Sequence, residues 1–145
     1  MAKEYSINDN DKLKSLQLPS LGYEILRHIS LPDLLGEDSS FIQYYMGKSL
    51  ARRFPLSTID EILAFFENAG FGNLECIKVK KGEYTFQLSS ALITERFTYK
   101  ENVTYRLEAG FLAEQLSQIH KETYECLDEA KKRQDCILFY CIPSI

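Results

Sequence analysis

The chain has 145 residues, of which 45% are hydrophobic and 12% are aromatic, with only 7 glycines and 4 prolines. This length and composition indicate a single folded domain with one core and exclude a disordered chain. A formal net charge of −4, with the basic residues scattered along the sequence, argues against DNA or RNA as a partner. The N-terminus lacks a signal-peptide pattern, and no stretch approaches 18 apolar residues, so we expect a cytoplasmic protein without a membrane span.

The N-terminal part of the sequence predicts an arm followed by short helices. Residues 1–18 are polar and have no hydrophobic period, which predicts a mobile arm ahead of one domain over residues 19–145. Residues 19–29 are typical of a short helix with proline in its first turn. The segment 31–40 adds a further helical turn, and Gly36 closes it.

Two longer helices are predicted next. The first covers residues 41–54 and is followed directly by a proline, which helps to end it. The second, in residues 57–72, has the clearest signals of the chain. Thr58 and Glu61 have the spacing of a capping box at its start, and Gly70 is a typical stop signal at its end.

After residue 72 the hydrophobic pattern changes from helical to alternating, which predicts a β-hairpin in residues 74–88. A two-residue turn at Lys81 and Gly82 closes it. This register puts Cys76 on the more polar face of the hairpin. The expected cross-strand pairs are Lys80 with Glu83, Val79 with Tyr84, and Ile77 with Phe86.

The C-terminal half predicts one helix and a second hairpin. Residues 89–102 fit either a short helix or an irregular connection. A helix follows from about Val103 to Ile119, and strands at 121–129 and 135–142 are joined by a charged loop. The last strand is apolar at nearly every position, so we expect it inside the sheet with both faces covered. The predicted fold is therefore α+β, with a four-stranded antiparallel sheet and about four to five helices.

Gly110 stands in the middle of the predicted helix at 103–119, where glycine costs about 1 kcal/mol relative to alanine. A second apolar face beside it carries Leu107 and Phe111, and a missing side chain there lets another backbone approach. Gly47 has the same character, with Ala51 one turn later. These five residues indicate close helix packing, either inside the fold or at a dimer interface. The opposite stripe, which we expect in the core, consists of Tyr105, Ala109, Leu112, Leu116 and Ile119.

The sequence contains no recognisable catalytic, metal or cofactor motif. His28 and His120 each end a helix, where an interaction with the helix dipole is the more ordinary role than general base. Glu108 and Glu114 lie about 120° apart around their helix, so they do not converge as an acid pair. The four cysteines are expected to be reduced thiols without a structural zinc ion. We therefore predict no catalytic residues, no metal and no cofactor.

Several aromatic side chains are numerous enough to line an apolar cavity, although an ordinary core explains them better. Phe71 belongs to the same set. The candidate ligand-binding residues are Phe65, Phe66, Tyr84, Phe86, Phe97 and Phe139.

Three stretches carry a family resemblance: YYMGKSLARRFPL, FFENAGFGNLECI and YRLEAGFLAEQL. They resemble a family of small Bacillus-type bacterial proteins of unknown function. The order of elements over residues 19–142 also resembles the four-vinyl-reductase superfamily, which includes bacterial sensor input domains and subunits of the TRAPP vesicle-tethering complex. The resemblance implies helices packed on an antiparallel sheet, frequent homodimers, and an apolar cavity that holds a small molecule or an acyl chain in some members.

The resemblance is incomplete at the C-terminus, because members often carry a glutamate, two cysteines and a glycine in a fixed spacing. Aligned on Cys136, that pattern matches Glu125 but meets Asp128 at the first cysteine and Lys132 at the glycine. From these observations we expect a non-enzymatic, homodimeric domain that binds an apolar small molecule. The alternative is an adaptor that docks another protein, and an enzyme ranks third.

Overall fold

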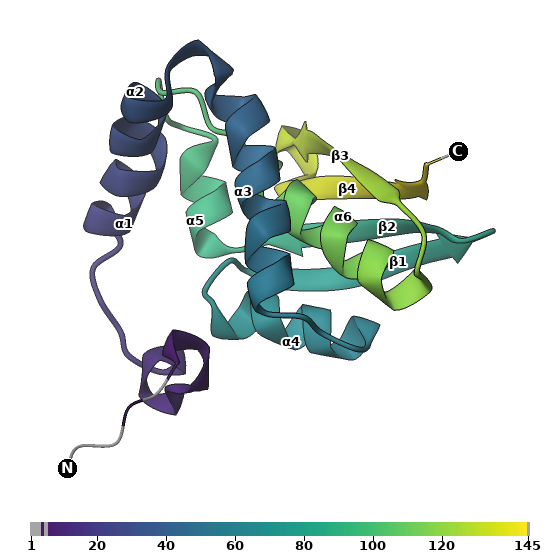
Figure 1. Ribbon diagram of the computed structural model, residues 1–145. Coiled ribbons are helices and arrows are strands. Elements are labelled where there is room, and N and C mark those ends of the chain that lie inside the picture. The colour runs from purple at the N-terminus through teal and green to yellow at the C-terminus, as the bar shows by residue number, and fades with distance from the viewer. Residues whose placement is uncertain (1–3, 5, 145) are drawn as a thin grey trace.

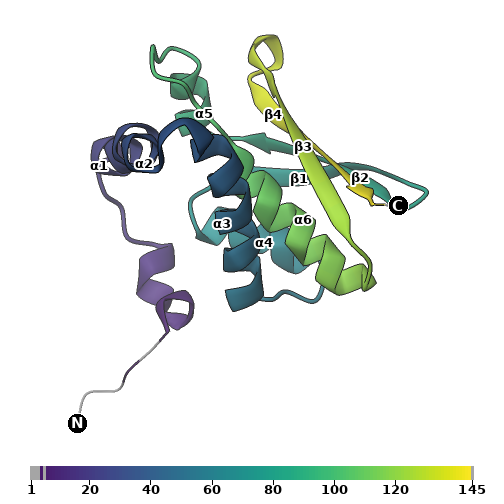
Figure 2. The ribbon, with the colours of Figure 1, turned by 45° about the horizontal axis from the view of Figure 1, so that its top comes forward.

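The computed structural model describes residue 4 and residues 6–144 and shows an α+β domain (Figure 1). Within this part of the chain, four strands form one antiparallel sheet in the order β1-β2-β4-β3. Figure 2 shows α3, α4 and α6 on the same face of that sheet. The predicted fold class is confirmed. The predicted arm contains two short 3-10 turns, Ile7–Asp9 and Asp11–Lys14, and its mobility stays a prediction; residues 1–3 and 5 of the arm lie outside the described residues.

The two predicted N-terminal helical pieces form one continuous helix, which we call the rod (residues 21–35). It consists of α1 (Leu21–Ile25), a π-helical turn (Leu26–Ser30) and α2 (Leu31–Leu35). In the π turn the Leu31 N–H donates to the Leu26 carbonyl, five residues earlier. This wider turn lets the helix continue through Pro32, whose ring has no N–H and crowds the carbonyl four residues before it. Gly36 ends the rod at φ 78°, as predicted.

The next two helices occur where the sequence predicts them. A 3-10 turn (Gly36–Asp38) leads into α3 (Ser39–Arg53), and α4 spans Ile59–Asn68. Thr58 caps α4, since its hydroxyl oxygen accepts from the Glu61 N–H at 3.1 Å. The Glu61 carboxylate reaches back to the Ser57 N–H at 2.7 Å, one residue earlier than a regular capping box requires.

The first hairpin consists of β1 (Asn73–Lys80) and β2 (Glu83–Ser89), and a β-bulge shifts its register. The pairs Lys80–Glu83 and Val79–Tyr84 are confirmed, but Phe86 pairs with Cys76 and not with Ile77. Because the bulge adds one residue to β1, Cys76 packs against the core and Ile77 is 49% exposed. The polar face predicted for Cys76 and the predicted pair Ile77–Phe86 were therefore wrong.

The second hairpin consists of β3 (Tyr124–Lys131) and β4 (Cys136–Pro143), and β4 lies inside the sheet as predicted. The prediction that both faces of β4 are covered is wrong. Tyr140 and Ile142 are 37% and 44% exposed, because α4 and α6 pack on one face only (Figure 2). The buried face of β4 consists of Ile137, Phe139 and Cys141.

The segment whose conformation was open contains a helix and an irregular connection. Ser90 caps α5 (Ala91–Arg96), and its hydroxyl accepts from the Ile93 N–H at 3.0 Å. The predicted helix around Gly110 is α6 (Arg106–His120), which begins three residues later than expected. Four members of its predicted core stripe are at most 5% exposed and Ile119 packs against them, so the orientation of that stripe is confirmed.

Helices α3 and α6 approach each other backbone to backbone through their glycines. A Cβ atom at Gly110 would lie 1.9 Å from the Tyr44 carbonyl oxygen, and one at Gly47 would lie 1.9 Å from the Leu107 carbonyl oxygen. Both distances are far shorter than any ordinary contact. The structure therefore places the two glycines against each other's helices within one chain, with Ala51 and Phe111 fully buried beside them.

Candidate functional site

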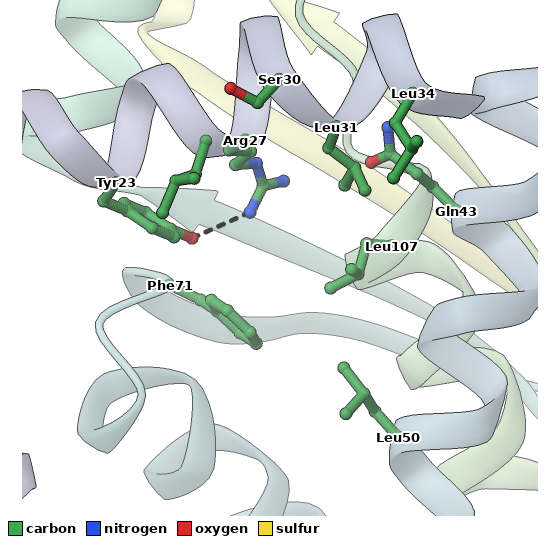
Figure 3. A pocket seen from close by; sticks show the side chains of 10 residues that line it. Tyr23, Arg27, Ser30, Leu31, Leu34, Gln43, Leu50, Phe71 and Leu107 are labelled. Atoms are coloured by element: carbon green, nitrogen blue, oxygen red, sulfur yellow. Dashed lines mark hydrogen bonds between the residues drawn. The ribbon is translucent and has the colours of Figure 1, made fainter. Parts of the chain in front are cut away.

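A groove of about 540 Å³ lies between the rod and the body of the domain (Figure 3). The rod forms one wall. Side chains from α3, from α6 and from the loop between α4 and β1 form the other. The lining residues are Tyr23, Leu26, Arg27, Ser30, Leu31, Leu34, Gln43, Leu50, Phe71 and Leu107.

The groove is apolar along most of its length. Five of its ten lining residues are leucines and two are aromatic, while Arg27, Ser30 and Gln43 supply polar atoms. Leu26 and Leu34 are 65% and 82% exposed, so the rod leaves its apolar side chains open to solvent. A mostly apolar surface with a few polar groups is typical of sites for small molecules.

Arg27 is the one charged side chain among the ten lining residues, and it is only 8% exposed. Its Nη1 donates to the Tyr23 hydroxyl at 3.0 Å, as Figure 3 shows. Its Nη2 donates to Glu108 Oε1 at 2.5 Å and to the Thr104 carbonyl at 3.2 Å. Two buried polar atoms of this ion pair, Arg27 Nε and Glu108 Oε2, have no hydrogen-bond partner.

The Arg27–Glu108 pair makes the polar part of the groove electrically neutral. Burial on its own disfavours the arginine cation, but the Glu108 carboxylate outweighs this effect and raises the pKa of Arg27 above its ordinary value. The guanidinium and the carboxylate form an ion pair in which the two charges cancel. A second charge brought into the groove would lose its hydration without finding a free counter-ion there.

A second buried ion pair holds the rod to α5. The Glu24 carboxylate accepts two hydrogen bonds of 2.8 Å from Arg96 and one of 2.9 Å from the Tyr99 hydroxyl. Burial on its own raises the pKa of Glu24, but these hydrogen bonds outweigh it and hold that pKa below its ordinary value. His28 Nε2 lies 3.3 Å from Glu24 Oε1, and burial, followed by the nearby Arg96 guanidinium, lowers the pKa of His28 to about 4.

The rod reverses the usual pattern of a surface helix, because its charged side chains are buried and its apolar side chains are exposed. Its inward face carries Glu24, Arg27 and His28, which are 6–8% exposed, and its apolar residues face the groove or solvent. On the side away from the groove, Leu21, Ile25 and Ile29 line a smaller cleft of about 270 Å³ together with Glu24, His28, Tyr99 and Glu101. Charged contacts join the rod to the body, and apolar surface remains on both sides of it.

None of the six aromatic residues predicted to bind a ligand lines the groove. Phe66, Phe86 and Phe139 are fully buried in the core. Phe65 stacks on Phe111 with ring centroids 4.8 Å apart, and Phe97 packs against the core. The Tyr84 hydroxyl lies 2.8 Å from His120 Nε2 near the chain's surface. Of the close-packing residues only Leu107 lines the groove, joined by Phe71 from the wider aromatic set.

Sequence reasoning missed the groove because its walls come from distant segments. Arg27 and Glu108 are 81 residues apart. One signal was present, namely Glu24, Arg27 and His28 within about one turn of a mostly apolar helix. That spacing marks one helix face, so buried partners for Glu24, Arg27 and His28 could have been expected.

Residue 4 and residues 6–144 lack two kinds of feature. No group of three or more His, Cys, Asp or Glu side chains there is arranged to hold a metal ion. None of the helices in that part of the chain has the length and apolar character needed to cross a membrane.

Comparison with known proteins gives a family and a fold. The family described as "Protein of unknown function (DUF2507)" matches residues 20–141. The "Uncharacterized protein YslB" of Bacillus subtilis (strain 168) is 41% identical over 128 residues, which cover 88% of this chain and 86% of that protein.

Solved structures share the fold at low sequence identity. A vinyl-4-reductase family protein from Methanocaldococcus jannaschii matches with a TM-score of 0.70 and 21% identity, covering 100% of this chain and 99% of that one. The phenol-responsive sensory domain of the transcription activator PoxR, solved with phenol, matches with a TM-score of 0.63 and 12% identity, covering 88% and 76%. A trafficking protein particle complex subunit 3 from Naegleria fowleri gives a TM-score of 0.45 and 13% identity, covering 87% and 90%.

Proposed function

The chain belongs to the DUF2507 family of proteins of unknown function, and we propose that it binds a small, neutral, largely apolar molecule in the groove between the rod and the body. The observation that carries this proposal is the groove itself, an apolar space of about 540 Å³ with one buried, charge-neutral polar pair beside it. Its volume is within the range of small-molecule sites. The fold shared with a phenol-responsive sensory domain supports the same function.

The polar groups of the groove define the class of ligand further. Glu108 cancels the charge of Arg27, so the groove offers no net charge to an acid or an amine. The side chains of Tyr23, Ser30 and Gln43 offer hydrogen bonds at its walls. A ligand with an apolar body and one hydroxyl or carbonyl group, such as a substituted phenol or a small alcohol, satisfies both features.

Filling the groove tests this proposal. Ser30 is an exposed rod residue that lines the groove, so Ser30→Trp occupies part of the space while leaving the core intact. Asp33→Trp is the matched control, because Asp33 is an exposed rod residue outside the groove lining. Binding of the neutral dye N-phenyl-1-naphthylamine reports apolar sites, and its displacement by 1-naphthol reports a neutral ligand.

We expect 1-naphthol to displace the dye from the wild-type chain and from Asp33→Trp, and its affinity to fall at least tenfold in Ser30→Trp. Equal affinities for all three proteins would place the binding elsewhere and contradict the proposal. A complete lack of displacement in the wild type would contradict a neutral ligand.

We also propose that the chain forms a homodimer through the side of the rod that faces away from the groove. Leu21 is 71% exposed there, and Ile25 and Ile29 are 40% and 41% exposed. Exposed apolar side chains that recur at each turn along one side of a helix are typical of an interface. The rod stands at the outer edge of the domain (Figure 1).

Light scattering coupled to size exclusion tests the dimer. We expect the wild type to elute with twice the chain mass and Leu21→Glu/Ile29→Glu with the chain mass. Leu127→Glu, on the outer face of the sheet at 64% exposure, is the control and should remain dimeric. A monomeric wild type would contradict the dimer. The exposed rod would then favour the second candidate function, an adaptor that docks another protein.

A further inference from the structure

Two of the four cysteines face each other across the second hairpin. Cys126 on β3 pairs directly with Cys141 on β4, and their sulfur atoms are 2.9 Å apart. Both are reduced, and they are 1% and 0% exposed on the core face of the sheet. Neither residue contributes to the groove.

The backbone at Cys126 shows which kind of cross-strand pair this is. Its N–H donates to the Tyr44 hydroxyl at 3.0 Å, and its carbonyl accepts from Arg106 Nη1 at 3.2 Å. Both groups therefore point away from β4. Cys126 and Cys141 form a non-hydrogen-bonded pair, the kind in which opposite Cα atoms lie about 4.5 Å apart and side chains are closest. This separation falls within the range that a disulfide spans.

The other two cysteines have no such partner. Cys136 lies opposite Lys131, and Cys76 lies opposite Phe86. Neither of these two residues therefore has a cysteine opposite it on the neighbouring strand. The geometry selects one pair among the four cysteines.

We propose that Cys126 and Cys141 are a redox-active pair that hydrogen peroxide converts reversibly into a cross-strand disulfide. A thiolate sulfur attacks one peroxide oxygen, the O–O bond breaks, and the departing hydroxide takes up a proton to form water. The sulfur of the second cysteine then attacks the sulfenic acid, so that the S–S bond forms, the S–O bond breaks and a second water leaves. In total, two thiols and one hydrogen peroxide give one disulfide and two waters.

The position of the pair determines how it reacts. β3 is an edge strand of the sheet, so local opening at this edge exposes Cys126 to a molecule as small as hydrogen peroxide. Burial, followed by the hydrogen bond from Cys141, raises the pKa of the Cys126 thiol. Because the thiolate is the reactive form, oxidation is slow at neutral pH and accelerates as the pH rises.

The disulfide would restrain β3, the strand whose side chains bind both α3 and α6. Glu125, next to Cys126, accepts hydrogen bonds from Tyr44 and from Lys48 of α3. Asp128 forms an ion pair of 2.7 Å with Arg106 at the start of α6. Oxidation therefore links β3, which carries these contacts to α3 and α6, covalently to the central strand β4.

Peptide mapping of the wild-type chain tests the proposal without any substitution. After exposure to hydrogen peroxide at pH 8, free thiols are alkylated in denaturant and the digest is analysed by mass spectrometry. We expect a peptide pair joined through Cys126 and Cys141, two hydrogens lighter than the sum of its parts. Free thiols should fall from four to two, and dithiothreitol should restore all four.

Two variants and a melting experiment complete the test. Cys141→Ala should abolish the cross-link, whereas Cys136→Ala, also a buried cysteine, should retain it. The disulfide closes a loop between two cysteines that are 15 residues apart. Oxidation should therefore raise the wild-type Tm by about 10 °C. A cross-link to Cys76 or Cys136, or oxidation of Cys76 or Cys136 while Cys126 and Cys141 remain reduced, would overturn the proposal. If Cys141→Ala does not fold, the peptide mapping of the oxidised wild-type chain tests the proposal by itself.

Discussion

Replacing Gly110 with alanine tests the backbone contact between α3 and α6. The new Cβ would lie 1.9 Å from the Tyr44 carbonyl oxygen, whereas ordinary van der Waals contact of a Cβ atom begins at 3.4 Å. The two helices must therefore separate by roughly 1.5 Å at this point. A gap of even 1 Å removes up to about half of each dispersion contact across an interface.

The expected cost follows from two opposing effects. Overpacking a tight core costs about 1–3 kcal/mol, occasionally more, and a contact as short as this one lies at the upper end or above. Alanine recovers about 1 kcal/mol through its better helix propensity. We expect Gly110→Ala to lose about 2 kcal/mol of unfolding free energy, which lowers the Tm by about 7 °C in a chain of this length.

Gly22 provides the matched control for this prediction. It also lies in a helix, and a Cβ there meets nothing within 4 Å. Gly22→Ala should therefore stabilise the chain by about 0.5–1 kcal/mol. Urea unfolding followed by circular dichroism measures both variants. A Gly110→Ala chain at least as stable as the wild type would refute the close contact.

Three further predictions concern the rod and α4. Arg27→Met leaves the Glu108 carboxylate buried without its partner, so urea unfolding should show a loss of about 3–5 kcal/mol, most of which Arg27→Met/Glu108→Leu recovers. The folded chain binds fewer protons at His28 than the unfolded chain does, since its pKa is lowered from 6.5 to about 4. The Tm should therefore fall as the pH drops from 6.5 to about 4, and the Tm of His28→Gln should fall less over the same range. Equal decreases of Tm in both proteins would contradict the buried neutral imidazole. Thr58→Ala removes the helix cap and should cost about 1 kcal/mol, measured in the same urea experiment, whereas no loss would argue against the cap.

Local signals in the sequence predicted most of the elements. The capping pair Thr58 and Glu61, the stop at Gly70 and the turn at Lys81 each involve residues within a few positions of one another. Their physics is local, so the pattern alone was sufficient. The orientation of α6 could also be predicted, because its core stripe repeats at the helical period.

Features that depend on distant contacts were not predicted. The β-bulge at Ile77 places Cys76 in the core, and alternation by itself cannot show where a strand gains a residue. The rod continues through Pro32 because a π turn precedes it, while local rules predict a break. The ion pair beside the groove joins Arg27 and Glu108, which are 81 residues apart in the sequence.

The binding of a neutral apolar molecule between the rod and the body is tested most directly by nuclear magnetic resonance. A titration of the ¹⁵N-labelled wild-type chain with 1-naphthol measures the chemical-shift change of each backbone amide. We predict that the largest changes occur in the rod, at Phe71 and around Leu107, which surround the groove. Changes confined to other surfaces, or none at saturating 1-naphthol, would contradict the account.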